Sequence, residues 1–170
     1  KASLNYSYAF RLAIVRRIID SLAAIFPKKK LQIHLLWDSI HNAIVEEQIG
    51  EKSVITHRHT ANRVFEGKPV IVSGFNTTNS YIGVGLPGAQ KHLFASDHGA
   101  GITIQKFNQA GLTRPHPKNH ITHIYQTKEP YKKIVHHMTN EGIDHVMKML
   151  EEASILRPVV RLRPLAVFKG

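Results

Sequence analysis

Ser96-Asp97-His98-Gly99-Ala100-Gly101 is the stretch around which the rest of the chain is organised. It follows an apolar run, Leu93-Phe94-Ala95, which predicts the end of a buried strand that turns sharply. Glycine permits positive φ and close backbone approach, so Gly99 and Gly101 leave room for a bulky ligand beside His98. If the helix suggested by residues 103–107 begins here, its first N–H groups can bind phosphate. From these residues alone, His98 is either a turn residue or a catalytic group.

The composition describes a globular chain with a strong positive charge. Its 170 residues suffice for one domain with its own core, or for half of a larger one. A net charge of +11 attracts polyanions. We expect nucleic acid as the partner, with a membrane surface or an acidic protein as the alternative. The chain has 12 histidines and no cysteine, so a metal site would use imidazole and carboxylate ligands, which suit manganese, zinc, nickel or iron.

No apolar run approaches the roughly 20 residues of a membrane span, and no targeting signal is visible. We therefore expect no membrane association and a cytoplasmic or otherwise unknown location. Because the chain begins with Lys1 and not with Met, we also expect that a segment upstream has been lost.

Hydrophobic periodicity predicts an α+β fold. Residues 3–26 carry apolar side chains at spacings of three and four, which predicts a long amphipathic helix. Short strands are predicted at 31–37, 53–58, 69–73, 80–85, 121–126 and 159–168, besides the one that leads into His98, and two further helices at 130–139 and 143–154. We expect one mixed sheet of short strands, flanked by the long first helix and the two helices after Pro130. A single domain would cover residues 1–170.

Polar segments follow several of these predicted strands. Asp38-Ser39-Ile40-His41-Asn42 comes directly after the strand at 31–37, where α/β-type sheets commonly place their sites. A helix cap with a packed histidine is the plainer interpretation. His57 and His59 share one face of the strand that they end, a geometry that metal sites use and that also arises by chance. The loop 74–79 is rich in hydroxyls and amides, which hold a phosphate or a base, or satisfy the loop's own backbone.

Taken in order, six segments resemble motifs in the C-terminal part of the RtcB family of RNA ligases, the GTP- and manganese-dependent enzymes of tRNA splicing and RNA repair. They are Asp38-Ser39-Ile40-His41-Asn42 (D-V-x-H-N in the family), His57-Arg58-His59-Thr60-Ala61 (H-R-K-G-A), Ser73-Gly74-Phe75-Asn76-Thr77-Thr78-Asn79-Ser80-Tyr81 (P-G-S-M-G-T-x-S-Y), His98-Gly99-Ala100-Gly101 (H-G-A-G), Glu129-Pro130-Tyr131-Lys132 (E-A-Y-K) and Arg163-Pro164-Leu165-Ala166-Val167-Phe168-Lys169-Gly170 (K-P-L-x-V-x-K-G). The resemblance spans nearly all 170 residues. It implies the C-terminal half of the RtcB fold, with the N-terminal half of the family domain absent.

The resemblance also implies a reaction and a set of site residues. His98 would be the catalytic nucleophile, since an imidazole nitrogen can attack the α-phosphate of GTP. Its guanylate would pass to an RNA 3′-phosphate (or 2′,3′-cyclic phosphate), and a 5′-hydroxyl would then displace GMP and join the ends. His41 would bind a metal, Mn²⁺ in this family, which neutralises phosphate oxygens. The nucleotide-binding residues would be Asn42, Ser73, Gly74, Asn76, Ser80, Gly99, Ala100, Gly101, Tyr131 and Lys169.

Two functions of different classes follow from these residues. In the first, the chain belongs to an RtcB-like ligase that acts on RNA (tRNA halves or broken RNA), together with its missing N-terminal half or a larger assembly. In the second, it is a non-catalytic RtcB-like RNA-binding subunit of a ribonucleoprotein. His98, His41 and Lys169 favour the ligase, because a scaffold needs no nucleophile. The pI near 10 and the departures from the motifs, at His59, Thr60, Phe75 and Ile102, favour the scaffold. A structural histidine-rich domain without a nucleotide site is the third interpretation.

Overall fold

The computed structural model describes residues 2–28, 31–127 and 132–169. By its internal contacts the chain divides into two compact units, Lys1–Asp38 and Ser39–Gly170, and each is described here by itself. No helix among the described residues combines the length and the hydrophobicity needed to cross a bilayer.

The first unit is built on the helix α1, Ala2–Ile25, which confirms the helix predicted from the apolar stripe. The strand predicted at 31–37 is wrong, because this segment pairs with no strand. Two of its side chains, Leu31 and Ile33, instead line an apolar pocket with Ile19, Ala23, Phe26 and Pro27. Asp38 accepts hydrogen bonds from Arg11 of α1, at 2.6 Å and 2.8 Å, and so closes the segment against the helix.

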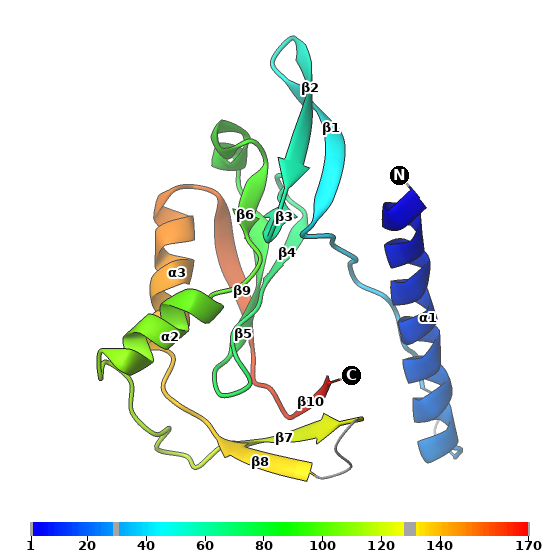
Figure 1. Cartoon of the computed structure of the whole chain (residues 1–170), viewed down its shortest axis with the longest axis vertical. Helices are drawn as coiled ribbons and strands as arrows, with labels where there is room; N and C mark the ends of the chain where they lie inside the picture. The colour runs from blue at the N-terminus through cyan, green and yellow to red at the C-terminus, as the bar shows by residue number, and fades with distance from the viewer. Residues whose placement is uncertain (1, 29–30, 128–131, 170) are drawn as a thin grey trace. The chain divides into compact units, whose positions relative to one another are not determined.

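The second unit contains the strands, and its α+β class confirms the predicted one. Among the described residues the strands form four small sheets where one mixed sheet was expected. The strands are β1 (Ala43–Ile49), β2 (Lys52–Arg58), β3 (Ala61–Arg63), β4 (Pro69–Val72), β5 (Ser80–Gly85), β6 (Ala95–Asp97), β7 (Ile121–Gln126), β8 (Lys132–His136), β9 (Leu156–Leu162) and β10 (Ala166–Lys169). They pair as β1-β2, β3-β6, β4-β5-β9 and β10-β7-β8, and the last sheet is mixed because β10 runs parallel to β7 (Figure 1).

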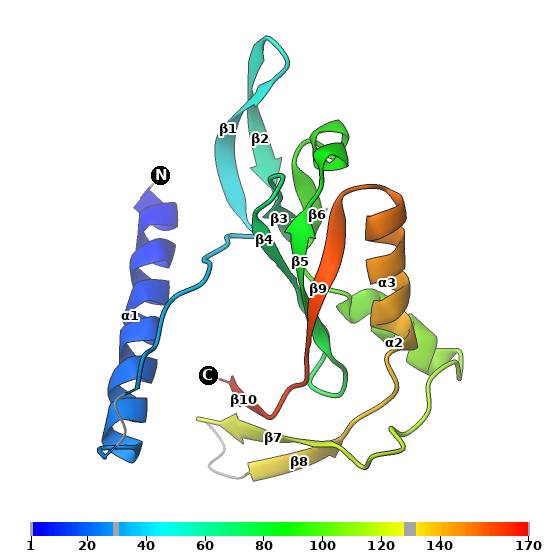
Figure 2. The same ribbon diagram turned by 180° about the vertical axis from the view of Figure 1, so that it is seen from behind.

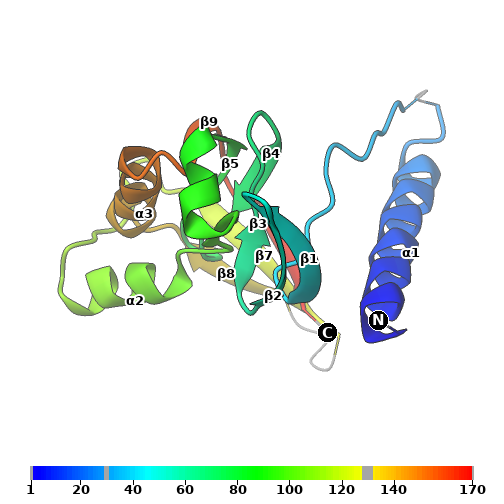
Figure 3. The same ribbon diagram turned by 90° about the horizontal axis from the view of Figure 1, so that it is seen from above.

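The core of this unit lies between the sheet β4-β5-β9 and two helices, α2 (Gly101–Gln109) and α3 (Glu141–Glu152). Figure 2 shows α3 beside β9, and Figures 1 and 3 show α2 next to α3. The two helices can approach closely because Gly142 has no side chain: a Cβ there would stand only 2.8 Å from the Cα of Ile104. The side chains that fill the core include Val64, Val70, Val72, Tyr81, Ile104, Ile143, Met147 and Leu156.

Two predicted elements near the C-terminus are corrected. The helix predicted at 130–139 is wrong over its described part, which forms the strand β8 and pairs antiparallel with β7. The β-branched pair Ile134-Val135 favours a strand over a helix. The strand predicted at 159–168 is two strands, β9 and β10, separated at Arg163-Pro164-Leu165, where Pro164 cannot donate a ladder hydrogen bond.

Candidate active site

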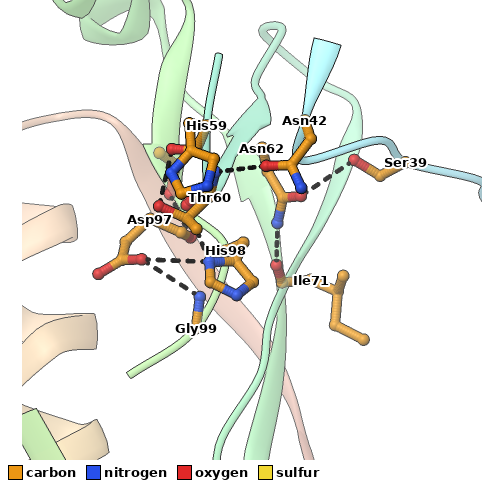
Figure 4. Close-up of polar contacts among 10 residues, drawn as sticks. Ser39, Asn42, His59, Thr60, Asn62, Ile71, Asp97, His98 and Gly99 are labelled. Atoms are coloured by element: carbon orange, nitrogen blue, oxygen red, sulfur yellow. Dashed lines mark hydrogen bonds and ion pairs between the residues drawn. The ribbon is translucent and has the colours of Figure 1, made fainter. Parts of the chain in front are cut away.

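His98 stands at the end of β6, where the antiparallel pair β3-β6 stops at Ala61 and Asp97. Its backbone N–H donates to the carbonyl of Thr60 at 3.2 Å, and its ring Nδ1 lies 2.8 Å from the same oxygen (Figure 4). Because a carbonyl oxygen only accepts, this contact places the ring proton on Nδ1 and leaves a lone pair on Nε2. The His98 side chain as a whole is 38% exposed.

A second imidazole lies against the first. The rings of His41 and His98 stack with centroids 4.8 Å apart and planes 13° from parallel. The His41 carbonyl accepts from the N–H of Ala61 at 3.0 Å, and the Asn42 side-chain oxygen accepts from the N–H of Thr60 at 2.8 Å. The segment that carries His41 is therefore fastened to Thr60, which also holds His98, and to its neighbour Ala61.

Gly99 serves close packing, contrary to the expectation that it leaves room for a ligand. The Ser73 N–H donates to the His98 carbonyl at 2.9 Å, and the Ala100 N–H donates to the Ser73 carbonyl at 2.8 Å. A Cβ at Gly99 would stand 2.9 Å from the Ser73 carbonyl oxygen. At Gly101 a Cβ would meet only the ring of Phe75, at 3.7 Å, so the open space lies there.

In the loop between β4 and β5, hydroxyl side chains accept hydrogen bonds from the backbone N–H groups. The N–H of Gly74 donates to the Ser80 hydroxyl at 3.0 Å, and that of Phe75 to the Thr78 hydroxyl at 2.9 Å. The loop is also tied to the helix α3 region, because the N–H of Asn79 donates to the Asn140 side-chain oxygen at 2.8 Å. Asn76 is half-buried in this loop. The loop is thus held rigidly beside Gly99, through Ser73.

The helix α2 begins at Gly101, three residues after His98. Ala100 is its N-cap residue, is 1% exposed, and offers no side-chain hydrogen bond to the helix. The first N–H groups of an α-helix have no partner within the helix, and they favour an anion. The turn that follows His98 can therefore receive a phosphate group.

Three residues of this site were not found from the sequence: Thr60, Asn62 and Asp97. Thr60 acts through its carbonyl oxygen, which any residue carries, so no residue type could reveal it. Asn62 is 3% exposed, accepts from the Ser39 hydroxyl at 3.2 Å, and donates to the Ile71 carbonyl at 2.6 Å (Figure 4). A carboxylate oxygen of Asp97 lies 3.7 Å from His98 Nδ1. The same oxygen accepts a hydrogen bond from the Gly99 N–H at 3.3 Å. The position of Asp97 next to His98 was the available signal.

A buried ion-pair group supports this site from β1, β2 and β3. Glu47 is 3% exposed and binds Arg58 at 2.9 Å and Arg63 at 2.7 Å. Burial alone would raise the pKa of Glu47, but the hydrogen bond from Arg63 and the charges of both arginines outweigh it, so the pKa is lowered. Arg58 also donates to the Leu93 carbonyl at 2.7 Å. Arg58 therefore has a structural role and joins β2 to the segment that precedes β6.

The metal donors that a manganese site needs are not assembled by the described residues. No group of three histidine, aspartate or glutamate side chains within 2–28, 31–127 and 132–169 lies close enough together to hold a metal ion. His57 is exposed in β2, and His59 lies beyond the end of that strand, so the two do not share a strand face as expected. From this part of the chain His41 would contribute one ligand.

Two further predicted site residues are not placed beside His98 by any contact within the described residues. Tyr131 lies outside the described residues. Lys169 is the last residue of β10, where its backbone pairs with that of Gln126 in β7. The residues that the structure brings together are therefore His41, Asn42, Ser73, Gly74, Ser80, His98, Gly99, Ala100 and Gly101.

Comparison with known proteins agrees with these motifs. The family model for tRNA-splicing ligase RtcB matches residues 1–170. The chain is 29% identical to the tRNA-splicing ligase RtcB of Pyrococcus horikoshii and 26% identical to that of Thermococcus kodakarensis, in each case over 100% of this chain. It is 29% identical to the RNA-splicing ligase RtcB homolog 1 of Entamoeba dispar over 98% of this chain. It spans only 22%, 40% and 36% of those three proteins, respectively. The chain belongs to the tRNA-splicing ligase RtcB family.

Proposed function

We propose that this chain carries the guanylate-accepting histidine of an RNA ligase, and that His98 is that residue. The observation that carries the proposal is the 2.8 Å contact between His98 Nδ1 and the Thr60 carbonyl. It supports a neutral ring with its proton on Nδ1 and a nucleophilic lone pair on Nε2. The family and the names of the relatives support RNA ligation as the overall reaction.

In the first step, His98 Nε2 attacks the α-phosphorus of GTP. A P–N bond forms, the P–O bond to the β-phosphate breaks, and pyrophosphate leaves with the electron pair. The ring then carries a positive charge and keeps its proton on Nδ1. That charge is stabilised by the Thr60 carbonyl at 2.8 Å and by the Asp97 carboxylate at 3.7 Å.

In the second step, an oxygen of an RNA 3′-phosphate attacks the guanylate phosphorus, and the P–N bond breaks to restore the neutral His98 ring. A 5′-hydroxyl then attacks the activated RNA phosphate, releases GMP and closes the phosphodiester. The hydroxyl proton passes to solvent or to a base. Both RNA ends and the nucleotide are polyanionic, which suits a chain with a net charge of +11.

The surrounding residues would bind and position the guanylate. The first N–H groups of α2 would face its phosphate, and the rigid loop that contains Ser73, Gly74, Asn76 and Ser80 would flank it. Asn42 would act indirectly, because its side chain holds Thr60. Tyr131 and Lys169 remain proposals from the motifs alone.

Manganese, when bound, would neutralise phosphate charge in this reaction. The described residues do not form its site, because His41 supplies a single imidazole. We expect the other ligands of the metal to come from outside the described residues.

The alternative proposal is a non-catalytic RNA-binding subunit. One observation favours it: two of the departures from the motifs, Phe75 and Ile102, are apolar side chains that are 54% and 74% exposed. Such a surface beside the histidine suits contact with another macromolecule better than contact with a charged nucleotide.

One experiment, on the longest form of the protein that its gene encodes, distinguishes the two proposals. The protein is incubated with α-labelled GTP and Mn²⁺, denatured, and separated by electrophoresis. The ligase proposal predicts a labelled band that acid removes, as expected of a phosphoramidate, and that His98→Ala abolishes while His92→Ala retains it. Absence of label in the folded parent would overturn the ligase proposal and favour the RNA-binding subunit.

A further inference from the structure

A second group of imidazoles lies outside the candidate active site. His116 and His120 belong to the segment between α2 and β7, and their rings stack with centroids 4.4 Å apart. The ring of His137, which follows β8, meets His120 edge-on at 5.8 Å. His116 and His120 are half-buried, whereas His137 is 3% exposed. We refer to these three residues as the histidine cluster.

The cluster is preorganised by backbone hydrogen bonds. The N–H of His116 donates to the His137 carbonyl, and the N–H of His137 donates to the His120 carbonyl, both at 2.8 Å. The Thr122 hydroxyl donates to the Pro164 carbonyl at 3.1 Å, so it accepts from the Nε2–H of His137 at 2.6 Å. His137 is therefore a fixed support, and the two half-buried rings of His116 and His120 are presented on it.

The charges around the cluster favour an anion. Burial comes first in lowering the pKa of His120 and of His137, and the positive neighbours Arg163 and His116 lower both further. Lys118 acts on His120 in the same direction. The N–H of Lys118 donates to His116 Nδ1 at 3.2 Å, which places the His116 proton on Nε2, where it can donate to a ligand.

The other titratable side chain of this region, His136, is held separately, since its Nδ1 lies 2.9 Å from the Asn119 side-chain oxygen. Arg114 stands at the start of the segment, where its N–H and carbonyl bind Thr139. The charged and titratable groups named around the cluster are thus bases. A phosphate oxygen placed among them would offset their mutual repulsion and favour the protonated form of the half-buried His120 ring.

The cluster is joined to the loop that we propose to flank the guanylate. The N–H of Met138, next to His137, donates to the Thr77 carbonyl of that loop at 2.9 Å. On the other side Met138 forms a bridge with Pro115, next to His116. Met138 thus connects the cluster to the loop between β4 and β5, the loop that we propose to flank the guanylate.

We propose that His116, His120, Lys118 and Arg163 form a binding site for a backbone phosphate of the RNA strand, and that His120 takes up a proton as the phosphate binds. The site rests on the proposed function only in taking RNA as the polyanion. A metal site is the competing use of three imidazoles, but the described residues offer no group of three ligands with suitable geometry.

The test measures the binding of a fluorescently labelled single-stranded RNA to the longest form of the protein, as a function of salt, at pH 5.5 and pH 8.0. At pH 5.5 His120→Gln should reduce the slope of log affinity against log salt by about 0.7, the value of one lost phosphate contact on a single strand. At pH 8.0 the ring is neutral, so the slope should be unchanged. The matched control His92→Gln replaces an exposed histidine outside the cluster and should match the parent at both pH values.

A second variant guards against a simple loss of folding. His120→Lys keeps a positive charge at both pH values, so its RNA affinity should depend less on pH than that of the parent. Equal slopes for the parent and His120→Gln at pH 5.5 would overturn the proposal, as would an equal effect of His92→Gln. Guanylate labelling is measured on the same proteins without RNA. If labelling fails in the parent while these slopes behave as expected, the ligase proposal falls and the phosphate site stands.

Discussion

The carbonyl oxygen of Thr60 accepts two hydrogen bonds from His98, one from its backbone N–H at 3.2 Å and one from its ring Nδ1 at 2.8 Å. The same contact fixes the position of the chain and the tautomer of the ring. Thr60 has a φ of 57°, in the left-handed region that a β-branched residue seldom adopts. The family motif has glycine at this position, which relates a departure in the sequence to backbone strain beside the proposed nucleophile.

Replacing this threonine by glycine should therefore stabilise the protein. Thr60→Gly removes the left-handed strain but adds backbone entropy to the unfolded chain, and we expect a net gain of about 1 kcal/mol in the free energy of unfolding. Urea unfolding measures it. The Thr60 hydroxyl donates to the His59 carbonyl at 2.7 Å, and a loss of stability would mean that this bond outweighs the strain.

The two glycines of the histidine turn should differ in their tolerance of a methyl group. Gly99→Ala places a Cβ 2.9 Å from the Ser73 carbonyl and should cost about 1–3 kcal/mol of unfolding free energy. Gly101→Ala meets only the Phe75 ring at 3.7 Å and lies in the first turn of α2, so it should cost little. Comparable losses in the two variants would contradict the assigned role of Gly99.

Glu47 should account for much of the fall in the free energy of unfolding at acid pH. Because its folded pKa lies below the usual 4.5, it stabilises the folded state above that value, and this contribution is lost as the pH falls through the folded pKa. Glu47→Gln leaves Arg58 and Arg63 without their carboxylate and should cost about 3–5 kcal/mol near neutral pH. It should also flatten the dependence of stability on pH below 4.5.

The control for that prediction is Glu51→Gln, which changes an exposed carboxylate at the turn after β1. Chemical unfolding of both variants between pH 3 and pH 7 separates a buried ion pair from a general change in net charge. An acid limb as steep in Glu47→Gln as in the parent would show that other groups control it.

Tyr81 should titrate separately from other tyrosines. Burial and the hydrogen bond that its hydroxyl donates to Asp144 raise its pKa to about 12. The absorbance of tyrosinate, followed from pH 9 to pH 12.5, should therefore show a late component among the five tyrosines. Tyr81→Phe should remove that component and leave the earlier ones unchanged; a late component that persists would belong to another tyrosine.

Local patterns in the sequence were enough to predict α1, most of the strands and the helix α3, because each is a short-range periodic pattern. These patterns failed where contacts with distant segments of the chain determine the secondary structure. The apolar run 31–37 joins no sheet, and only its Leu31 and Ile33 line a pocket with the helix, while residues 132–136 pair with β7 instead of forming a helix. The strand β1 was also not predicted, since its alternation depends on the hairpin with β2.

The candidate site, too, was predictable from the sequence only in part. Motif order placed His41, His98 and Ser73 in one site, and the structure brings them together. Sequence could not tell that Gly99 is required by the Ser73 carbonyl, because the clash is with a residue that follows a different strand, β4. Nor could it identify the Thr60 carbonyl, which acts through the backbone and leaves no signature in residue type.

Mass spectrometry can show whether Nε2 of His98 accepts the guanylate, as we propose. The full-length protein is incubated with GTP and Mn²⁺, digested at a pH that preserves P–N bonds, and its peptides are sequenced. We expect a guanylate on the peptide that contains His98, attached to the imidazole and lost in acid. A guanylate attached to a lysine, or to another histidine while His98 stays unmodified, would contradict it.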